Sequence, residues 1–171
     1  MTRAFIGAGS NIDPERHLAE AVRLLGAAAH IRAISTVYLT APLDRPDQPS
    51  YYNCVVEIET ALPPLELKGA VLRRIEAELG RRRGKDKFAS RPIDLDLVLY
   101  GDVTMAEEEL TLPDPEILRR PFLAVPLAEL APELTLPGSK LTLSEIASRM
   151  QQSGMTPLAA YSDRLKRGIH T

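Results

Sequence analysis

The spacing of apolar positions changes from one segment of this chain to the next, and it predicts alternating strands and helices. Residues 4–7 form a short apolar run that is typical of a strand. Asp13 and Pro14 then indicate the start of a helix, because aspartate is a good N-cap and proline is tolerated at the first helical position. Apolar residues of that helix recur at helical spacing, at Leu18, Ala21, Val22 and Leu25.

The next segments predict two strands, a helix and a further strand. Residues 31–40 are rich in β-branched side chains, and residues 52–60 form a second such run after a proline-rich loop. Pro63-Pro64 opens a second helix, which Gly80 ends, as glycine often does. Residues 93–100 complete the order βαββαβ. This is the order of an α+β, ferredoxin-like fold, with both helices on one face of a sheet that contains antiparallel pairs.

Beyond Gly101 the pattern is weaker and contains many prolines. We expect short helices near residues 122–130 and 143–151, in a C-terminal extension of helices and loops that packs on the sheet. Residues from about 156 onward are expected to be loosely held. Because 171 residues is an ordinary length for one domain, we predict a single domain over residues 1–171.

The composition of the chain mainly excludes classes of protein. The chain is 44% hydrophobic and 26% charged with a net charge of −2, so nothing overall attracts it to nucleic acid or to an anionic membrane. It has no apolar stretch near the ~20 residues of a membrane span and no secretory signal pattern at its start. The single cysteine, Cys54, lies in an apolar run and is expected to be a buried structural thiol. These features favour a cytoplasmic protein.

Two carboxylates stand out on the last predicted strand. Strand alternation places Asp94 and Asp96 on one face, with Cα atoms about 6.5–7 Å apart, and it places on the core face Ile93, Leu95, Leu97 and Leu99. A solvated polar face is one explanation. However, aspartate is a poor strand former and neighbouring like charges repel, so we favour a metal role. Carboxylates combined with substrate phosphates suit Mg²⁺, and such a pair can hold two ions.

A basic loop precedes this strand. Residues 81–91 contain six cations, at Arg81, Arg82, Arg83, Lys85, Lys87 and Arg91. Taken alone, the cluster fits a solvated loop or a nucleic-acid patch. Beside a magnesium site it fits a polyphosphate, because arginine forks bind phosphate oxygens. The chain has no P-loop, protein-kinase signature, zinc-ligand spacing or serine-hydrolase motif.

Four separated motifs resemble signatures of the hydroxymethyl-dihydropterin pyrophosphokinase family. The first is Ile6-Gly7-Ala8-Gly9-Ser10-Asn11. The second comprises Thr40-Ala41-Pro42-Leu43, Asp47-Gln48-Pro49 and Tyr52-Asn53. The third comprises Ile75-Glu76, Gly80-Arg81-x-Arg83 and Arg91-Pro92-Ile93-Asp94-Leu95-Asp96. The fourth comprises Arg120-Pro121-Phe122, Pro126-Leu127 and Ala131-Pro132. The resemblance covers roughly residues 4–134, and the ferredoxin-like fold of that family agrees with the predicted element order.

The resemblance implies pyrophosphate transfer from ATP to 6-hydroxymethyl-7,8-dihydropterin in folate biosynthesis, with release of AMP. It implies two Mg²⁺ ions on Asp94 and Asp96, and catalytic roles for these two residues together with Arg81 and Arg91. It implies ATP contacts at Arg73, Glu76, Arg83, Phe88, Ile93, Thr111, Asp114 and Arg120. It implies pterin contacts at Thr40, Pro42, Leu43, Tyr51, Asn53 and Phe122. We expect a monomer whose partners are these small molecules, with no nucleic acid and no membrane.

Three positions depart from the family pattern. Asp114 stands where a histidine is common and would add negative charge near the phosphates. Arg73 replaces a common glutamine and would compensate by pairing with Asp114 or by reaching a phosphate. Phe88 is followed by Ala89-Ser90 instead of Gly-Pro. Two alternatives therefore stay open: a non-catalytic or repurposed relative that binds nucleotide or pterin, and a nucleic-acid module, which the low aromatic content disfavours.

Overall fold

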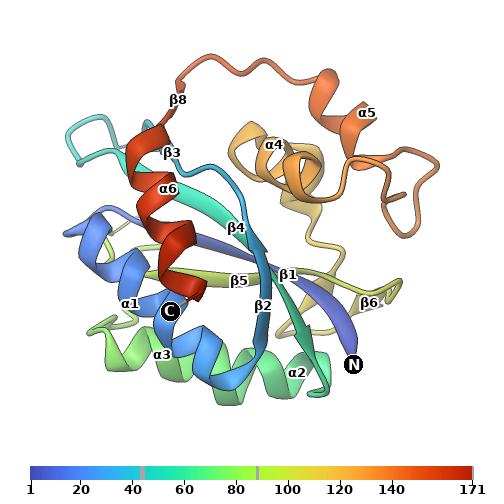
Figure 1. Cartoon of the computed structure of the whole chain (residues 1–171), viewed down its shortest axis with the longest axis horizontal. Coiled ribbons are helices and arrows are strands. Elements are labelled where there is room, and N and C mark those ends of the chain that lie inside the picture. The colour runs from blue at the N-terminus through green and yellow to red at the C-terminus, as the bar shows by residue number, and fades with distance from the viewer. Residues whose placement is uncertain (43–44, 88, 171) are drawn as a thin grey trace.

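The computed structural model of the chain describes residues 1–42, 45–87 and 89–170 (Figure 1). Its main sheet has the strand order β5-β1-β4-β3-β8, with β2 also paired to β4, and every pair in it is antiparallel. A separate two-stranded sheet pairs β6 (Met105–Ala106) with β7 (Thr111–Leu112). The strands of the main sheet are β1 (Thr2–Ser10), β2 (His30–Ile34), β3 (Tyr38–Thr40), β4 (Tyr51–Thr60), β5 (Asp94–Tyr100) and β8 (Met155–Pro157).

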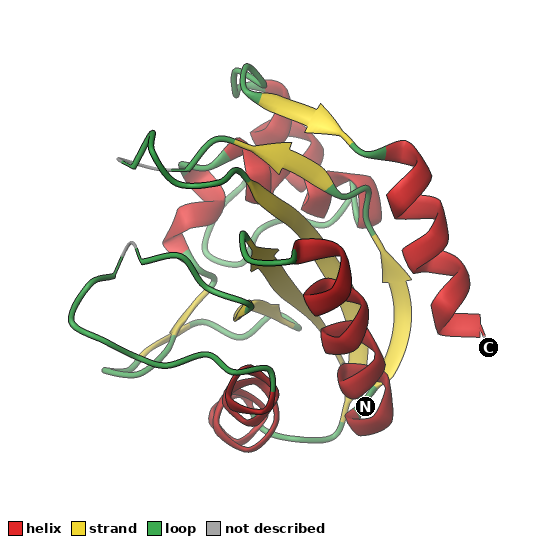
Figure 2. Ribbon diagram, turned by 90° about the vertical axis from the view of Figure 1, so that its left-hand side faces the viewer, coloured by secondary structure: helices red, strands yellow, loops and turns green. Residues whose placement is uncertain are grey.

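Helices lie on both faces of the sheet (Figure 2). One face carries α1 (Pro14–Ala28) and a second helix made of α2 (Pro64–Glu66), a π-helical segment (Leu67–Leu72) and α3 (Arg73–Glu78). This arrangement confirms the predicted ferredoxin-like βαββαβ unit. The opposite face carries α4 (Pro121–Leu130), which packs against α5 (Leu143–Ser148). Each face has its own apolar core, one around Ile6, Val56 and Leu95 and the other around Phe5, Val55 and Leu127.

Two local predictions are wrong in detail. Residues 31–40 do not form one strand, because the chain leaves the ladder between β2 and β3. There, the N–H of Thr36 donates to Glu129 at 2.9 Å, and the N–H of Val37 donates to Ser162 at 2.8 Å. Asp13 precedes α1 with φ of 42°, and its carboxylate pairs with Arg16 at 2.6 Å instead of capping the helix. In both cases side chains from other positions decide the local structure.

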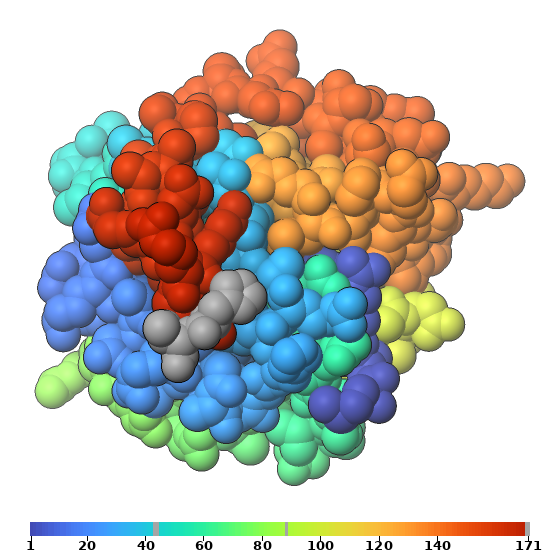
Figure 3. All heavy atoms as spheres, viewed as in Figure 1, coloured from blue at the N-terminus to red at the C-terminus, as the bar shows by residue number. Residues whose placement is uncertain are grey.

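The C-terminal residues are not loosely held. β8 pairs with β3, and α6 (Ala159–Arg167) with a 3₁₀ turn (Gly168–His170) packs across α1 and β2 (Figure 3). Tyr161 and Leu165 are 7% and 5% exposed and belong to the same core as Leu18. The prediction for residues 156 onward was wrong because this anchoring depends on contacts with distant strands. No helix in the described part of the chain is long and apolar enough to cross a membrane.

A bulge interrupts the alternation of β5. Ile6 faces Leu97 while its neighbour Phe5 faces Leu99, so Val98 is an extra residue on β5. The prediction that Leu99 shares a face with Leu97 is therefore wrong. Leu99 lies in the core around Phe5, because a bulge shifts every later side chain to the other face. Asp94 and Asp96 precede the bulge and keep the predicted common face, which is the face covered by α4.

Candidate active site

Glycines on β1 lie beside the two aspartates. Gly7 is the cross-strand neighbour of Asp96, and Gly9 is the neighbour of Asp94 on one side and of Asn53 on the other. A Cβ atom on Gly9 would lie only 2.6 Å from Oδ1 of Asn53. Because β1 has no side chains at these two positions, the floor between the carboxylates and the Asn53 amide stays open.

Two adjoining cavities lie over this floor, between the sheet and the start of α4. The first, of about 250 Å³, is lined by the carboxylates Asp94, Asp96 and Asp114 among others. The second, of about 220 Å³, is lined by residues from the proline-rich and basic loops, Gln48, Lys87 and Arg91 among them. We call the two together the central cleft. Its two halves share Tyr51, Asn53, Asp94 and Phe122.

The apolar end of the central cleft has the features that a flat heterocycle needs. Phe122, in the first turn of α4, presents a ring, and the Asn53 amide on β4 presents donors and acceptors. Nδ2 of Asn53 donates to Oγ1 of Thr40 at 2.7 Å, which sets the orientation of the amide. Partial burial raises the pKa of Tyr51, so this phenol keeps its proton at neutral pH.

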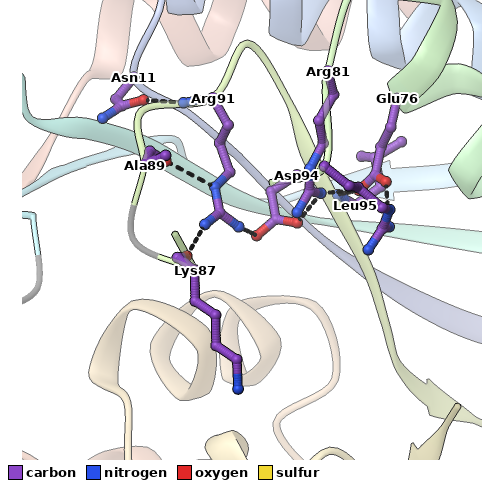
Figure 4. A network of polar contacts seen from close by, with 9 residues as sticks. Asn11, Glu76, Arg81, Lys87, Ala89, Arg91, Asp94 and Leu95 are labelled. Atoms are coloured by element: carbon purple, nitrogen blue, oxygen red, sulfur yellow. Dashed lines mark hydrogen bonds and ion pairs between the residues drawn. The ribbon is translucent and has the colours of Figure 1, made fainter. Parts of the chain in front are cut away.

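At its charged end the central cleft is lined by Asp94 and Arg91, which belong to a network of arginines and carboxylates that extends beyond the cleft lining (Figure 4). Arg81 donates to Oδ1 of Asp94 at 2.5 Å, and Arg91 donates to Oδ2 of the same carboxylate at 3.1 Å. Arg81 also pairs with Glu76, whose other oxygen accepts from Arg83 at 2.9 Å. Three of the six cations of the basic loop are thereby held next to β5.

Glu76 connects this network to the strand. Its side chain is almost completely buried, and Oε1 accepts the backbone N–H of Leu95 at 2.8 Å. Leu95 stands between the two aspartates, so Glu76 on α3 fixes the segment of β5 that presents them. A buried carboxylate needs such partners, because burying an unpaired charge is costly.

Asp96 differs from Asp94 because its carboxylate has no hydrogen-bond or ion-pair partner within the described residues. Dehydration in the central cleft and the negative charges of Asp94, Asp114 and Glu76 raise the pKa of Asp96 to about 7. A divalent cation at this end would relieve the repulsion. No three metal-ligating side chains cluster among the described residues, and Asp94 and Asp96 project from the same face of β5. That small donor set fits Mg²⁺, which commonly completes its coordination with substrate phosphates and water.

The structure also places the departures from the family pattern. Asp114 lines the central cleft, and its carboxylate accepts the N–H of Glu116 at 2.9 Å, capping a 3₁₀ turn (Pro115–Leu118). Partial burial raises the pKa of Asp114. Arg73 pairs with Glu109 at 3.7 Å, so the suggested pairing of Arg73 with Asp114 is not formed. Near Asp114, Arg120 also lines the cleft and pairs with Glu116 at 2.8 Å.

The remaining predicted residues are distributed as follows. Thr111 lines a neighbouring cavity of about 220 Å³ that shares Asp96 and Asp114 with the central cleft. Ile93 is fully buried, with its side chain in the core under α1 and α3. Pro42 is half-buried shortly after β3. Leu43 and Phe88 lie outside the described residues.

Sequence reasoning assigns no role to several residues of the site, Gly9, Gln48 and Glu116 among them. Gly9 and Gln48 lie within the motifs, which give them no individual role, and the sequence around Glu116 carries no signal. Their places depend on strand register and loop packing, which appear only in the folded chain.

The chain is similar in sequence to known proteins. The chain matches the family model of 7,8-dihydro-6-hydroxymethylpterin-pyrophosphokinase (HPPK) over residues 5–132. It is 37% identical over 161 residues to the 2-amino-4-hydroxy-6-hydroxymethyldihydropteridine pyrophosphokinase of Haemophilus influenzae, covering 92% of this chain and 99% of that protein. It is 40% identical over 158 residues to the protein of the same name from Methylorubrum extorquens, covering 91% of this chain and 98% of that protein.

Solved structures support the fold. A crystal structure of Plasmodium falciparum HPPK-DHPS matches with a TM-score of 0.69 at 15% identity, over 92% of this chain and 47% of the longer one. A second such structure, of a triple mutant, matches with a TM-score of 0.72. At this identity the similarity concerns the fold alone, whereas the family model and the bacterial relatives concern the sequence itself. The chain therefore belongs to the 7,8-dihydro-6-hydroxymethylpterin-pyrophosphokinase family.

Proposed function

We propose that this chain transfers pyrophosphate from ATP to 6-hydroxymethyl-7,8-dihydropterin, giving AMP and the pterin diphosphate, as a step of folate biosynthesis. Its family and its full-length bacterial relatives are named for this activity. The observation that supports it most directly is the central cleft, in which an apolar end with an amide adjoins an end with paired carboxylates and arginines. One substrate of this reaction is a flat heterocycle and the other is a polyphosphate.

The pterin would occupy the apolar end. The ring of Phe122 would stack on it, and the Asn53 amide, oriented by Thr40, would pair with its polar edge. Tyr51 lines both halves of the cleft and would lie beside the hydroxymethyl group, where the pterin meets the phosphates. Pro42, which follows Thr40 closely in the chain, would complete the pocket wall, and the pterin contact of Leu43 stays a prediction.

ATP would bind as its magnesium complex at the charged end. Asp94 and Asp96 would hold two Mg²⁺ ions, which neutralise phosphate charge and polarise the phosphoryl oxygens when bound. Arg81, Arg83 and Arg91 would bind phosphate oxygens. Glu76 would keep Arg81 and Arg83 in place. We assign further nucleotide contacts to Arg73, Phe88, Thr111, Asp114 and Arg120. Ile93 is left out because its side chain is fully buried in the core and lies away from the cleft lining.

Catalysis would depend on positioning and charge neutralisation. The pterin oxygen attacks the β-phosphorus in line with the departing AMP, and no covalent enzyme intermediate is needed. Phe122 and Asn53 would hold the pterin ring and so position its hydroxymethyl oxygen for attack. Arg81 and Arg91 would stabilise charge on the transferred group. The proline-rich and basic loops, which line the cleft through Gln48 and Lys87, would close over it and exclude water as a competing acceptor.

A non-catalytic relative is not favoured. Asp114 is the main departure, but it lies beside an intact carboxylate pair and intact arginines. Its side chain is already engaged with the N–H of Glu116, so its charge is partly balanced. The chemistry that the reaction needs is therefore present despite the substitution.

Incubation with ATP, Mg²⁺ and the hydroxymethyl-dihydropterin tests the proposal directly. We expect AMP and the pterin diphosphate to form in equal amounts, and the double variant Asp94→Asn, Asp96→Asn to form neither. Pterin binding without AMP would instead indicate a binding protein. ATP hydrolysis that does not depend on the pterin would also contradict the proposal.

A further inference from the structure

Asn11 joins two loops that are far apart in the sequence. It follows β1 directly and is 3% exposed. Its Nδ2 donates to the carbonyl of Pro49 at 3.4 Å and to Oγ of Ser90 at 3.2 Å. Its Oδ1 accepts the N–H of Arg91 at 2.8 Å, and its own N–H donates to the carbonyl of Arg91 at 3.3 Å (Figure 4).

An amide is suited to this place because it combines an acceptor with two donors at one carbon. Oδ1 must face the Arg91 N–H, which can only donate, and Nδ2 must face the Pro49 carbonyl, which can only accept. Aspartate keeps the acceptor but has no donor. Alanine loses all three side-chain hydrogen bonds, so the Pro49 carbonyl and the partly buried Arg91 N–H lose their protein partner.

The two loops that Asn11 joins both contribute lining residues to the same half of the central cleft. Pro49 belongs to the proline-rich loop, which contributes Gln48 and leads into Tyr51. Arg91 ends the basic loop and reaches Asp94 with its guanidinium at 3.1 Å. The peptide groups of Arg91 are held on both sides by Asn11, so the guanidinium extends from a fixed point of the backbone.

We propose that Asn11 is a positioning residue, which sets the Arg91 side chain and the proline-rich wall in the relation that the substrates require. Asn11 lines neither half of the cleft itself and acts through the backbone of both loops. With Asn11 in place, the backbone of Arg91 is already positioned, so its side chain reaches the phosphates from a fixed point and less ordering is needed when the loops close. This inference rests on the proposed function for the identity of the substrates.

The test uses Asn11→Ala and Asn11→Asp in the full chain, with two readouts that need no turnover. One is the dissociation constant of the magnesium complex of α,β-methylene ATP by calorimetry, and the other is the hydrogen-exchange rate of the Arg91 amide. For Asn11→Ala we expect the dissociation constant to rise about tenfold or more, and Arg91 exchange to accelerate about tenfold. Asn11→Asp should keep Arg91 protected but raise KM for the pterin about fivefold, because the Pro49 contact is lost.

Ser162→Ala is the matched control. Ser162 is equally buried and also joins remote segments, through Val37 and Leu158, but it lies away from the cleft. We expect it to lower the melting temperature while leaving nucleotide affinity and Arg91 exchange unchanged.

The proposal is overturned if Asn11→Ala lowers only the melting temperature, as the control does. Should Asn11→Ala fail to fold, Asn11→Asp decides, and an unchanged KM for the pterin would overturn it. If the unmodified chain produces no AMP, the proposed function fails, while nucleotide affinity and Arg91 exchange still decide the role of Asn11.

Discussion

Arg91 donates to Oδ2 of Asp94 at 3.1 Å, and Arg81 donates to the other oxygen of the same carboxylate at 2.5 Å. Both oxygens of Asp94 are therefore paired with cations before any ligand binds. A metal ion reaches Asp94 only when the arginines move, and phosphate oxygens are suitable new partners for them. Metal and nucleotide should consequently bind as a complex, and each should bind poorly alone.

The first prediction concerns Arg91→Met, which removes one of the two cations on Asp94 and keeps an apolar stem. Affinity for free Mn²⁺, used as a probe without nucleotide, should increase about three- to tenfold because a competing cation is gone. Affinity for the magnesium complex of an ATP analogue should decrease about tenfold or more, because a phosphate ligand is gone. Calorimetry measures both. If both affinities change in the same direction, Arg91 does not leave Asp94 for the phosphates when the metal–nucleotide complex binds.

The second prediction contrasts Asp94→Asn with Asp96→Asn, both of which should abolish turnover. In metal-free buffer, Asp94→Asn should reduce the free energy of unfolding by roughly 1–3 kcal/mol, because two partly buried arginines lose their carboxylate. Asp96→Asn should increase it by up to about 1 kcal/mol, because repulsion from Asp94, Asp114 and Glu76 outweighs the attraction of Arg81 and solvent in the cleft screens these interactions. Urea unfolding in the presence of EDTA measures both changes. If the two variants change the free energy of unfolding in the same direction, the prediction is wrong.

The effect of Asp96→Asn should also depend on pH. The pKa of Asp96 is raised to about 7 in the folded chain by dehydration and acidic neighbours, whereas an unfolded aspartate titrates near ~3.9. The folded chain thus holds this proton more tightly than the unfolded chain. The Asp96 contribution to stability therefore falls as pH rises from about 4 through 7. The increase in the free energy of unfolding caused by Asp96→Asn should therefore be small near pH 4 and complete above about pH 7. Unfolding curves measured across that pH range test this.

The third prediction concerns Gly9→Ala, which places a Cβ 2.6 Å from Oδ1 of Asn53. The amide must shift and its bond to Thr40 should break, so KM for the pterin should rise about tenfold while the fold is kept. Gly69→Ala is the control, because its Cβ would meet no atom within 4 Å. Steady-state kinetics at saturating ATP measure the difference. Equal KM values for the two variants would show that Asn53 does not bind the pterin.

The fourth prediction tests the C-terminal helix. Leu165→Ala should reduce the free energy of unfolding by about 2–3 kcal/mol, because a side chain 5% exposed leaves a cavity in the core. Arg167→Ala, on the exposed side of the same helix, should change it by less than about 0.5 kcal/mol. Chemical denaturation measures both. If the two variants behave alike, α6 does not pack on α1 and β2 in solution.

Local sequence was sufficient for most of the architecture. Helical spacing at Leu18 and Leu25 and strand alternation at Asp94 and Asp96 each lie within one element, so each predicted its element correctly. The pairing of Asp94 and Asp96 on one face needed only the period of a strand. The same reasoning failed at Leu99, because the extra residue in β5 is defined by its pairing with β1.

By itself, the sequence determined which chemical groups this protein carries and on which local elements they stand: two carboxylates on a strand, a basic loop before it, and an amide and a ring elsewhere. Only the tertiary structure decided which groups meet. Gly9 lies between Asn53 and Asp94, and Asn11 holds Arg91, which is 80 residues away in the chain. The residues after 156 form a strand and a helix where looseness was expected. These relations depend on strand register and on packing between distant segments, and no local period carries that information.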